Sequence, residues 1–189
     1  GRGARQDAAR QLVSLFAQEE LYDYPVPDLR SADRKFTEML ACLGMGLRTL
    51  SNGDYPCAAR LGLQAEALVP KDSLRWLSSC YELLDAAYLW QGDYPKAISY
   101  AQNDYDVGER LADDKIRSTA LNALAAAHCY TRLYDQALAY SDRAIALERA
   151  IGDDKALAVR LGIKCEILLL MNRPDDALTV IEEAIGIDR

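Results

Sequence analysis

The sequence is poor in residues that catalysis, metal binding and nucleic-acid binding commonly use. Its 189 residues include one histidine, His128, which excludes motifs that need two, such as HExxH. Neither glycine-rich phosphate-binding pattern, GxxxxGK[ST] or GxGxxG, occurs. Acidic residues outnumber basic ones, giving a net charge of −7, whereas nucleic-acid binding needs clustered Lys and Arg. We therefore expect no nucleic-acid partner and no cofactor.

Long apolar runs are absent as well. No stretch of about 18 apolar residues occurs, so we expect no membrane contact by this segment, and no signal peptide opens the chain. The sequence begins with Gly rather than Met and stays apolar almost to its last residue, so we expect it to be part of a longer protein. The compartment stays open between the cytoplasm and the periplasmic part of a membrane-anchored protein.

Candidate metal ligands and nucleophiles have plainer explanations. The cysteines are odd in number and none forms a CxxC pair, which favours buried free thiols: Cys42, Cys57, Cys80, Cys129 and Cys165. The acidic pairs favour helix capping over cation binding: Asp113-Asp114, Asp153-Asp154 and Asp175-Asp176. His128 lies on a helical apolar pattern and is expected to be a hydrogen-bonded core residue. We predict no catalytic and no metal-binding residues.

What the sequence does have is one pattern that returns four times. A turn followed by an alanine occurs in Asn52–Ala58, Gln91–Ala97, Thr131–Ala137 and Met171–Ala177. The last alanines of these four segments are 39, 40 and 40 residues apart. A fixed period in this range indicates a stacked repeat, in which each unit buries its apolar face only against its neighbours.

Between these turns the apolar residues follow a helical period. Leu74, Leu77, Tyr81 and Leu84 make one stripe of a helix, and a comparable stripe follows each turn. The sequence thus predicts an all-α, right-handed superhelix of about four helix hairpins plus an N-terminal helix. We expect a capping helix and linker over residues 1–30 and a repeat domain over 31–189. The expected units are 34–70, 71–112, 113–152 and 153–189.

The repeat resembles the tetratricopeptide repeat in its small residues, with Ala58, Ala97, Ala137 and Ala177 at one conserved position of that motif. The resemblance covers about residues 34–189. Each unit is five or six residues longer than the usual 34, and Asp85 replaces a small residue. Long repeats of this kind are similar to the sensor regions of bacterial histidine kinases and transcription regulators. The resemblance implies a non-catalytic scaffold for protein–protein interaction in signal transduction.

The same resemblance implies a concave groove lined by the first helix of each unit, which would bind a protein or peptide. The residues at the matching positions are Ser79, Glu82, Ala86, Leu89, Trp90, Thr119, Asn122, Ala126, Tyr130, Glu166 and Leu169. Two interpretations stay open for Trp90 and Tyr130, which either anchor a ligand or simply pack between helices. The Lys/Asn clamp that some relatives use for chaperone tails is missing, so we reject that ligand.

Two alternative functions remain. The apolar C-terminal end would support a homodimer. A hydrolase built on Cys129 and His128 is disfavoured, because adjacent helical residues point about 100° apart. One further expectation concerns the N-terminal helix, which would use Leu12, Leu15 and Phe16 to cover a leucine stripe. That stripe is Leu40, Leu43, Leu47 and Leu50.

Overall fold

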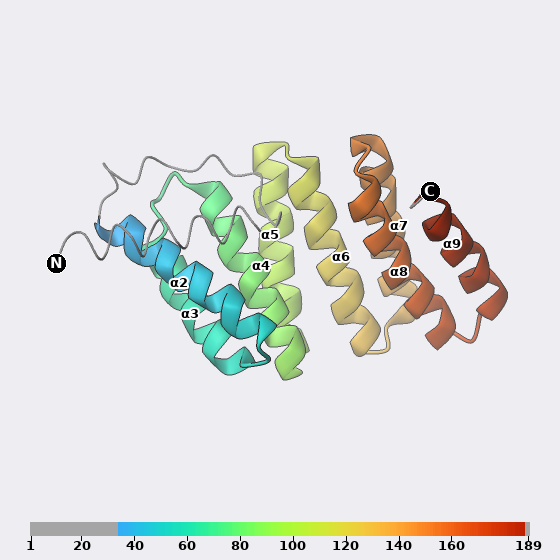
Figure 1. Ribbon diagram of the computed structural model, residues 1–189, viewed down its shortest axis with the longest axis horizontal. Helices are drawn as coiled ribbons and strands as arrows, with labels where there is room; N and C mark the ends of the chain where they lie inside the picture. The colour runs from blue at the N-terminus through green and yellow to red at the C-terminus, as the bar shows by residue number, and fades with distance from the viewer. Residues whose placement is uncertain (1–33, 188–189) are drawn as a thin grey trace.

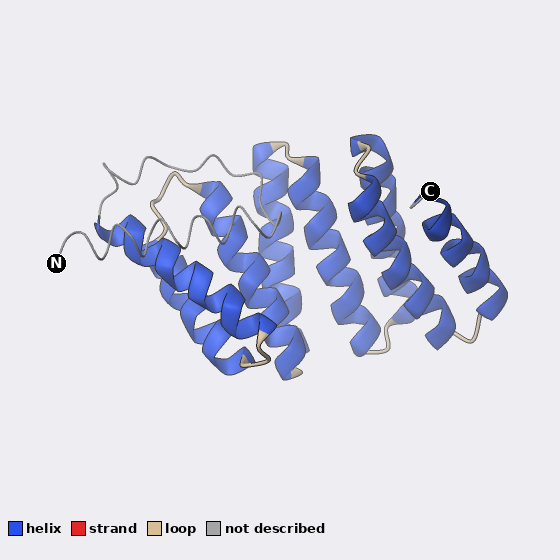
Figure 2. Ribbon diagram, in the orientation of Figure 1, coloured by secondary structure: helices blue, strands red, loops and turns tan. Residues whose placement is uncertain are grey.

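Every element that the structure describes is a helix (Figure 2). The computed structural model describes residues 34–187 and has eight helices and no strand in that range. They are α2 (Arg34–Ser51), α3 (Tyr55–Leu68), α4 (Leu74–Gln91), α5 (Tyr94–Leu111), α6 (Asp114–Tyr130), α7 (Tyr134–Ile151), α8 (Asp154–Leu170) and α9 (Pro174–Ile187). The prediction of an all-α helical-repeat stack is confirmed.

The repeated turns set where the helices begin. Asp54 and Asp93 precede α3 and α5, and each carboxylate accepts a hydrogen bond from a backbone N–H in the first helical turn. Such a cap satisfies a donor that the helix itself leaves unpaired. Gly53 and Gly92 adopt φ values of 80° and 79°, which a side chain with a Cβ rarely adopts. The sequence therefore stops one helix and starts the next within a few residues.

Capping explains two of the three acidic pairs. Asp113 and Asp153 cap α6 and α8 through hydrogen bonds from backbone N–H groups, as predicted. The prediction is wrong for Asp175 and Asp176, which lie inside the first turn of α9. Asp176 instead forms an ion pair with Arg173, with 2.7 Å between Oδ2 and Nε.

The helices stack side by side from α2 and α3 at one end to α9 at the other (Figure 1). Each helix packs on the next in sequence, and the alternate helices α2, α4, α6 and α8 also pack on one another. Among the described residues, α3, α5, α7 and α9 make no such contacts with each other. One layer is thus closer-spaced than the other, and the stack curves with α4, α6 and α8 on its inner side.

Small residues permit this close packing. The alanines of the repeat, Ala58, Ala97, Ala137 and Ala177, are all buried. Gly46 and Gly62 lie against Leu83 and Leu84, so close that a Cβ on either glycine would collide with a leucine side chain. A larger residue at these positions would force the hairpins apart.

His128 is buried and stacks on Tyr140, with ring centroids 5.2 Å apart, but its Nδ1 has no hydrogen-bond partner among residues 34–187. The prediction of a buried, hydrogen-bonded imidazole is therefore right about burial and wrong about the hydrogen bond at Nδ1.

Within the leucine stripe, Leu40 and Leu43 are buried in the core and Leu47 and Leu50 are half-buried. The expected capping segment, residues 1–30, lies outside the described residues.

Candidate binding groove

The inner faces of α4, α6 and α8 enclose a groove of about 390 Å³. This is within the range of ordinary ligand sites. The residues that line it are Glu82, Asp85, Ala86, Leu89, Trp90, Thr119, Asn122, Ala123, Ala126, Cys129, Tyr130, Ile163 and Glu166. Helices α4 and α6 contribute most of them and α8 contributes Ile163 and Glu166, because residues three or four apart lie on one face of a helix.

Nine of the eleven residues predicted from the repeat lie together in this groove. The exceptions are Ser79 and Leu169, which do not line it. Ser79 is buried, and its hydroxyl donates a hydrogen bond to the Arg75 carbonyl oxygen. Leu169 is exposed at the end of α8. The structure gathers the others, and whether they bind a ligand stays a prediction.

One end of the groove is aromatic. Trp90 and Tyr130 stand at the ends of α4 and α6, with ring centroids 6.2 Å apart and planes at 63°. Tyr55 stacks on Trp90 and Tyr94 stacks on Tyr130, at 6.2 Å and 5.9 Å. We call these four residues the aromatic row. The repeated turn produces it, because the turns before α3 and α5 each put a tyrosine at the start of the next helix.

The aromatic row is held in place but remains accessible. Trp90 is 54% exposed and Tyr130 is 43% exposed, although each ring contacts two others. The rings do pack on neighbouring helices, and they also line the groove, so the interpretation that they anchor a ligand stays a prediction. Rigid aromatic rings with one open side are typical anchors in protein interfaces.

The groove also carries acidic side chains from α4 and α8. Glu82, Asp85 and Glu166 line it, whereas no Lys or Arg is among the described residues that do so. Burial raises the pKa of Asp85 well above its usual range, and the neighbouring carboxyl groups of Asp104 and Glu82 raise it further. Burial raises the pKa of the Cys129 thiol, and the charge of Glu166 adds to the effect. A thiol with a raised pKa is a poor nucleophile at neutral pH.

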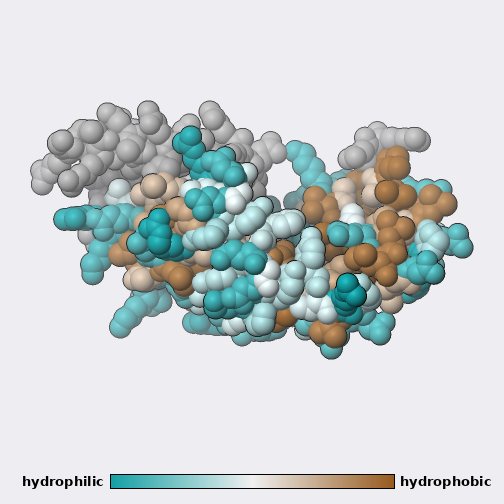
Figure 3. Space-filling view, turned by 90° about the horizontal axis from the view of Figure 1, so that it is seen from below, coloured by the Kyte–Doolittle hydropathy of each residue, from teal (hydrophilic) through white to brown (hydrophobic). Residues whose placement is uncertain are grey.

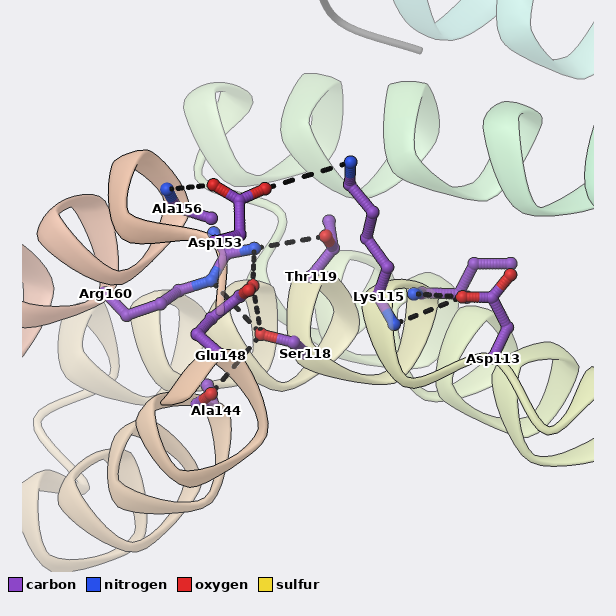
Figure 4. Close-up of polar contacts among 10 residues, drawn as sticks. Asp113, Lys115, Ser118, Thr119, Ala144, Glu148, Asp153, Ala156 and Arg160 are labelled. Carbon is purple, nitrogen blue, oxygen red and sulfur yellow. Dashed lines mark hydrogen bonds and ion pairs between the residues drawn. The ribbon is translucent and has the colours of Figure 1, made fainter. Parts of the chain in front are cut away.

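A buried ionic network joins the helices beside the groove (Figure 4). The Arg160 guanidinium on α8 donates to Glu148 Oε1 on α7 at 3.2 Å and to Thr119 Oγ1 on α6 at 3.1 Å. Ser118 donates to the same Glu148 oxygen at 2.6 Å. Thr119 lines the groove, so this network fixes the relative positions of α6, α7 and α8 at the groove wall.

Sequence reasoning missed Asp85, Ala123 and Ile163 as part of the groove set. The repeat resemblance assigned the position of Asp85 to helix packing, where a small residue is usual. The signal was present, because an acidic residue at a packing position demands an explanation. Cys129, the nucleophile of the disfavoured hydrolase alternative, also belongs to this set, and its buried thiol lies at the groove wall.

Two other surfaces stand out. A hollow of about 520 Å³ lies at the turn after α6, where Arg132 to Gln136 meet the end of α8. The C-terminal end of the stack carries exposed apolar residues on α9, namely Leu178, Ile181 and Ile185. Brown, hydrophobic patches lie at the same end in the space-filling view, with teal, hydrophilic residues beside them (Figure 3).

The described part of the chain carries no cluster of metal ligands and no membrane-spanning helix. Across residues 34–187, no group of three or more His, Cys, Asp and Glu side chains could hold a metal ion. None of the helices in this range is long and apolar enough to cross a membrane.

Comparison with solved structures identifies the fold. This chain is similar to aspartyl phosphate phosphatase F from Bacillus subtilis. The TM-score is 0.74 at 18% identity, and the match covers 82% of this chain and 41% of the phosphatase chain. The present chain thus corresponds to less than half of that structure, and the identity is low enough that the likeness shows the fold alone. No protein-family profile and no curated protein sequence matches the chain.

Proposed function

We propose that this chain is a non-catalytic protein-binding scaffold whose groove takes a peptide segment of a partner. The observation that carries the proposal is the groove itself, where an open aromatic row stands on rigid helices. The groove is pre-formed because α4, α6 and α8 pack directly on each other, so little ordering is needed on binding. Binding without catalysis fits the burial of the Cys129 thiol, which raises its pKa.

The finer assignment is to the long-repeat type of tetratricopeptide repeat, within a larger bacterial signalling protein of the histidine kinase or transcription regulator type. The 39- and 40-residue spacing and the small residues of each turn support it. The likeness to aspartyl phosphate phosphatase F supports it at the level of the fold. We do not transfer the phosphatase activity, because fold alone does not carry function.

The test is a binding experiment on a groove-blocked variant. Ala126 lines the groove and Ala146 is exposed on α7, so Ala126→Trp should fill the groove while Ala146→Trp serves as the matched control. Both proteins and the unaltered chain are applied to a cellulose-bound array of hexapeptides. We expect the unaltered chain and Ala146→Trp to bind the same peptides and Ala126→Trp to lose them. Equal binding by all three, or none by the unaltered chain, would refute the proposal.

A second candidate is homodimerisation through the C-terminal end. The exposed Leu178, Ile181 and Ile185 on α9 favour it, because exposed apolar patches commonly mark interfaces. Light scattering over a concentration series should then reveal a dimer that dissociates on dilution, and Ile181→Glu should shift it to the monomer. A monomer at every concentration would dismiss this candidate and leave the groove.

A further inference from the structure

Asp85 occupies a position that is small in every other unit of the repeat. The equivalent residues, spaced 39 or 40 positions apart along the chain, are Gly46, Ala125 and Cys165. All three are buried, and they let neighbouring helices approach. An acid at such a position loses hydration, which is unfavourable unless a hydrogen bond or an opposite charge compensates for it. The presence of Asp85 therefore needs an explanation other than packing.

The described part of the structure gives Asp85 no such compensation. The residue is 8% exposed, and within residues 34–187 it makes no hydrogen bond and no ion pair. Burial raises the pKa of Asp85, and the nearby charges of Asp104 and Glu82 raise it further. A carboxyl group in this setting favours its protonated form, because burial and like charges both oppose ionisation. Asp85 thus offers the groove that it lines one O–H donor and one carbonyl acceptor.

A second unpartnered polar group lies in the same groove, on the next inner helix. Asn122 of α6 lines the groove, and its Oδ1 has no hydrogen-bond partner among the described residues. Helices α4 and α6 pack directly on each other, so Asp85 and Asn122 belong to neighbouring walls of one groove. Buried polar groups are nearly always hydrogen-bonded in folded proteins. Two exceptions in one groove indicate that a bound group completes their hydrogen bonds.

A neutral carboxyl group and a free amide oxygen together fit a primary carboxamide. The carboxamide oxygen accepts the O–H of Asp85, and one carboxamide N–H donates to the Asp85 carbonyl, which gives two parallel hydrogen bonds. The second N–H is then available for Asn122 Oδ1. Lys and Arg side chains carry donors only, so neither accepts the carboxyl proton. A carboxylate lacks N–H donors, and its charge is opposed by Glu166, which also lines the groove.

The carboxamide has to come from a side chain rather than from the peptide main chain. A main-chain peptide group is trans, so its N–H and C=O point in opposite directions and cannot both meet one carboxyl group. Asp85 is also more than nine-tenths buried in the groove wall. A projecting side chain reaches such a group while the main chain follows the open face of the groove. Glutamine and asparagine are the two residues that carry this group.

We propose that the groove selects a peptide with a carboxamide side chain, glutamine or asparagine, which pairs with Asp85 and Asn122. An apolar residue of the same peptide contacts the exposed rings of Trp90 and Tyr130. This inference deepens the proposed function and depends on it. Glu82 also lines the groove but has an interaction of its own, and the proposed pairing does not involve it.

The experiment uses the full 189-residue chain and the hexapeptide array, in which one position is fixed as Gln, Asn, Glu, Lys or Leu. The strongest carboxamide peptide is then measured by calorimetry beside its methyl-ketone analogue, which keeps the shape and the oxygen of the carboxamide but has no N–H. Asp85→Leu removes the hydrogen-bonding group with little change in size, and Asp85→Asn keeps a donor and an acceptor. Asp72→Leu, at an exposed turn position, is the matched control.

We expect Gln or Asn peptides to dominate the array. The methyl ketone should bind about tenfold or more weakly than the carboxamide to the unaltered chain, to Asp72→Leu and to Asp85→Asn, because it leaves buried acceptors unpaired. In Asp85→Leu the two peptides should bind within about threefold of each other.

Three results would overturn this inference and leave the proposed function standing. They are peptide binding without a carboxamide preference, a methyl-ketone effect in Asp85→Leu as large as in the unaltered chain, and loss of that effect in Asp85→Asn. Failure of the unaltered chain to bind any peptide would overturn both the inference and the proposed function.

Discussion

Removing the Arg160 side chain while keeping Glu148 should destabilise the protein strongly. Glu148 is 1% exposed, and its Oε1 accepts from Arg160 and Ser118. Its Oε2 has no hydrogen-bond partner among the described residues. Arg160→Met keeps much of the side-chain volume but leaves a buried carboxylate with one neutral donor. Breaking a buried ion pair on one side costs about 3–5 kcal/mol, and we expect a loss of that size.

The double variant Arg160→Met with Glu148→Gln separates charge from packing. The neutral amide can still accept from Ser118, so most of the loss should be regained, giving a coupling energy of about 2–4 kcal/mol between the two sites. Urea unfolding followed by circular dichroism measures the unaltered chain, Arg160→Met, Glu148→Gln and the double variant, with equal slopes required for comparison. A loss below about 1 kcal/mol in Arg160→Met, or a double variant no more stable than the single one, would refute this reasoning.

Three further predictions concern burial. Burial raises the pKa of Asp104 to about 8 from 3.8. Between these two pH values the folded state holds a proton that the unfolded state has released. The free energy of unfolding should therefore fall as the pH rises through this range. Asp104→Asn should flatten that slope; an unchanged slope would show that another group causes it. Gly62→Ala should lower the free energy of unfolding by about 1–3 kcal/mol, because the added methyl group presses on Leu84. Gly162 is exposed and faces open space, so Gly162→Ala should raise the free energy of unfolding by about 0.5–1 kcal/mol. Thermal unfolding that ranks the two variants the other way would refute the packing argument. In the native protein Cys129 should react with Ellman's reagent more slowly than the half-buried Cys57, and a faster reaction would reopen the hydrolase alternative.

The helical repeat could be predicted because its determinants are local. Asp54 and Asp93 cap helices, Gly53 and Gly92 end turns, and Ala97 meets a neighbour at a fixed place in each unit. Each of these roles depends on a few neighbouring residues along the chain. A pattern that repeats in the sequence therefore gives helix hairpins that repeat in the structure.

The groove could be predicted only in outline, for the same reason. Periodicity identifies which helix faces inward, and hence Trp90 and Tyr130. It does not indicate that Tyr55 and Tyr94 support those rings, because these contacts join the start of one helix to the end of another. The resemblance also assigned Asp85 to helix packing, because a repeat motif gives the residue that is usual at a position and does not account for an exception in one unit.

The measurement that tests the central claim most directly is an NMR titration of the two tryptophan indole N–H signals. Trp90 lines the groove, whereas Trp76 lies near the start of the same helix, about 21 Å away along its axis, and contacts Phe36. With the strongest array peptide, our account predicts that the Trp90 signal shifts in proportion to occupancy while the Trp76 signal stays in place. A peptide that binds by calorimetry but leaves the Trp90 signal unmoved would contradict the claim that the groove is the binding site.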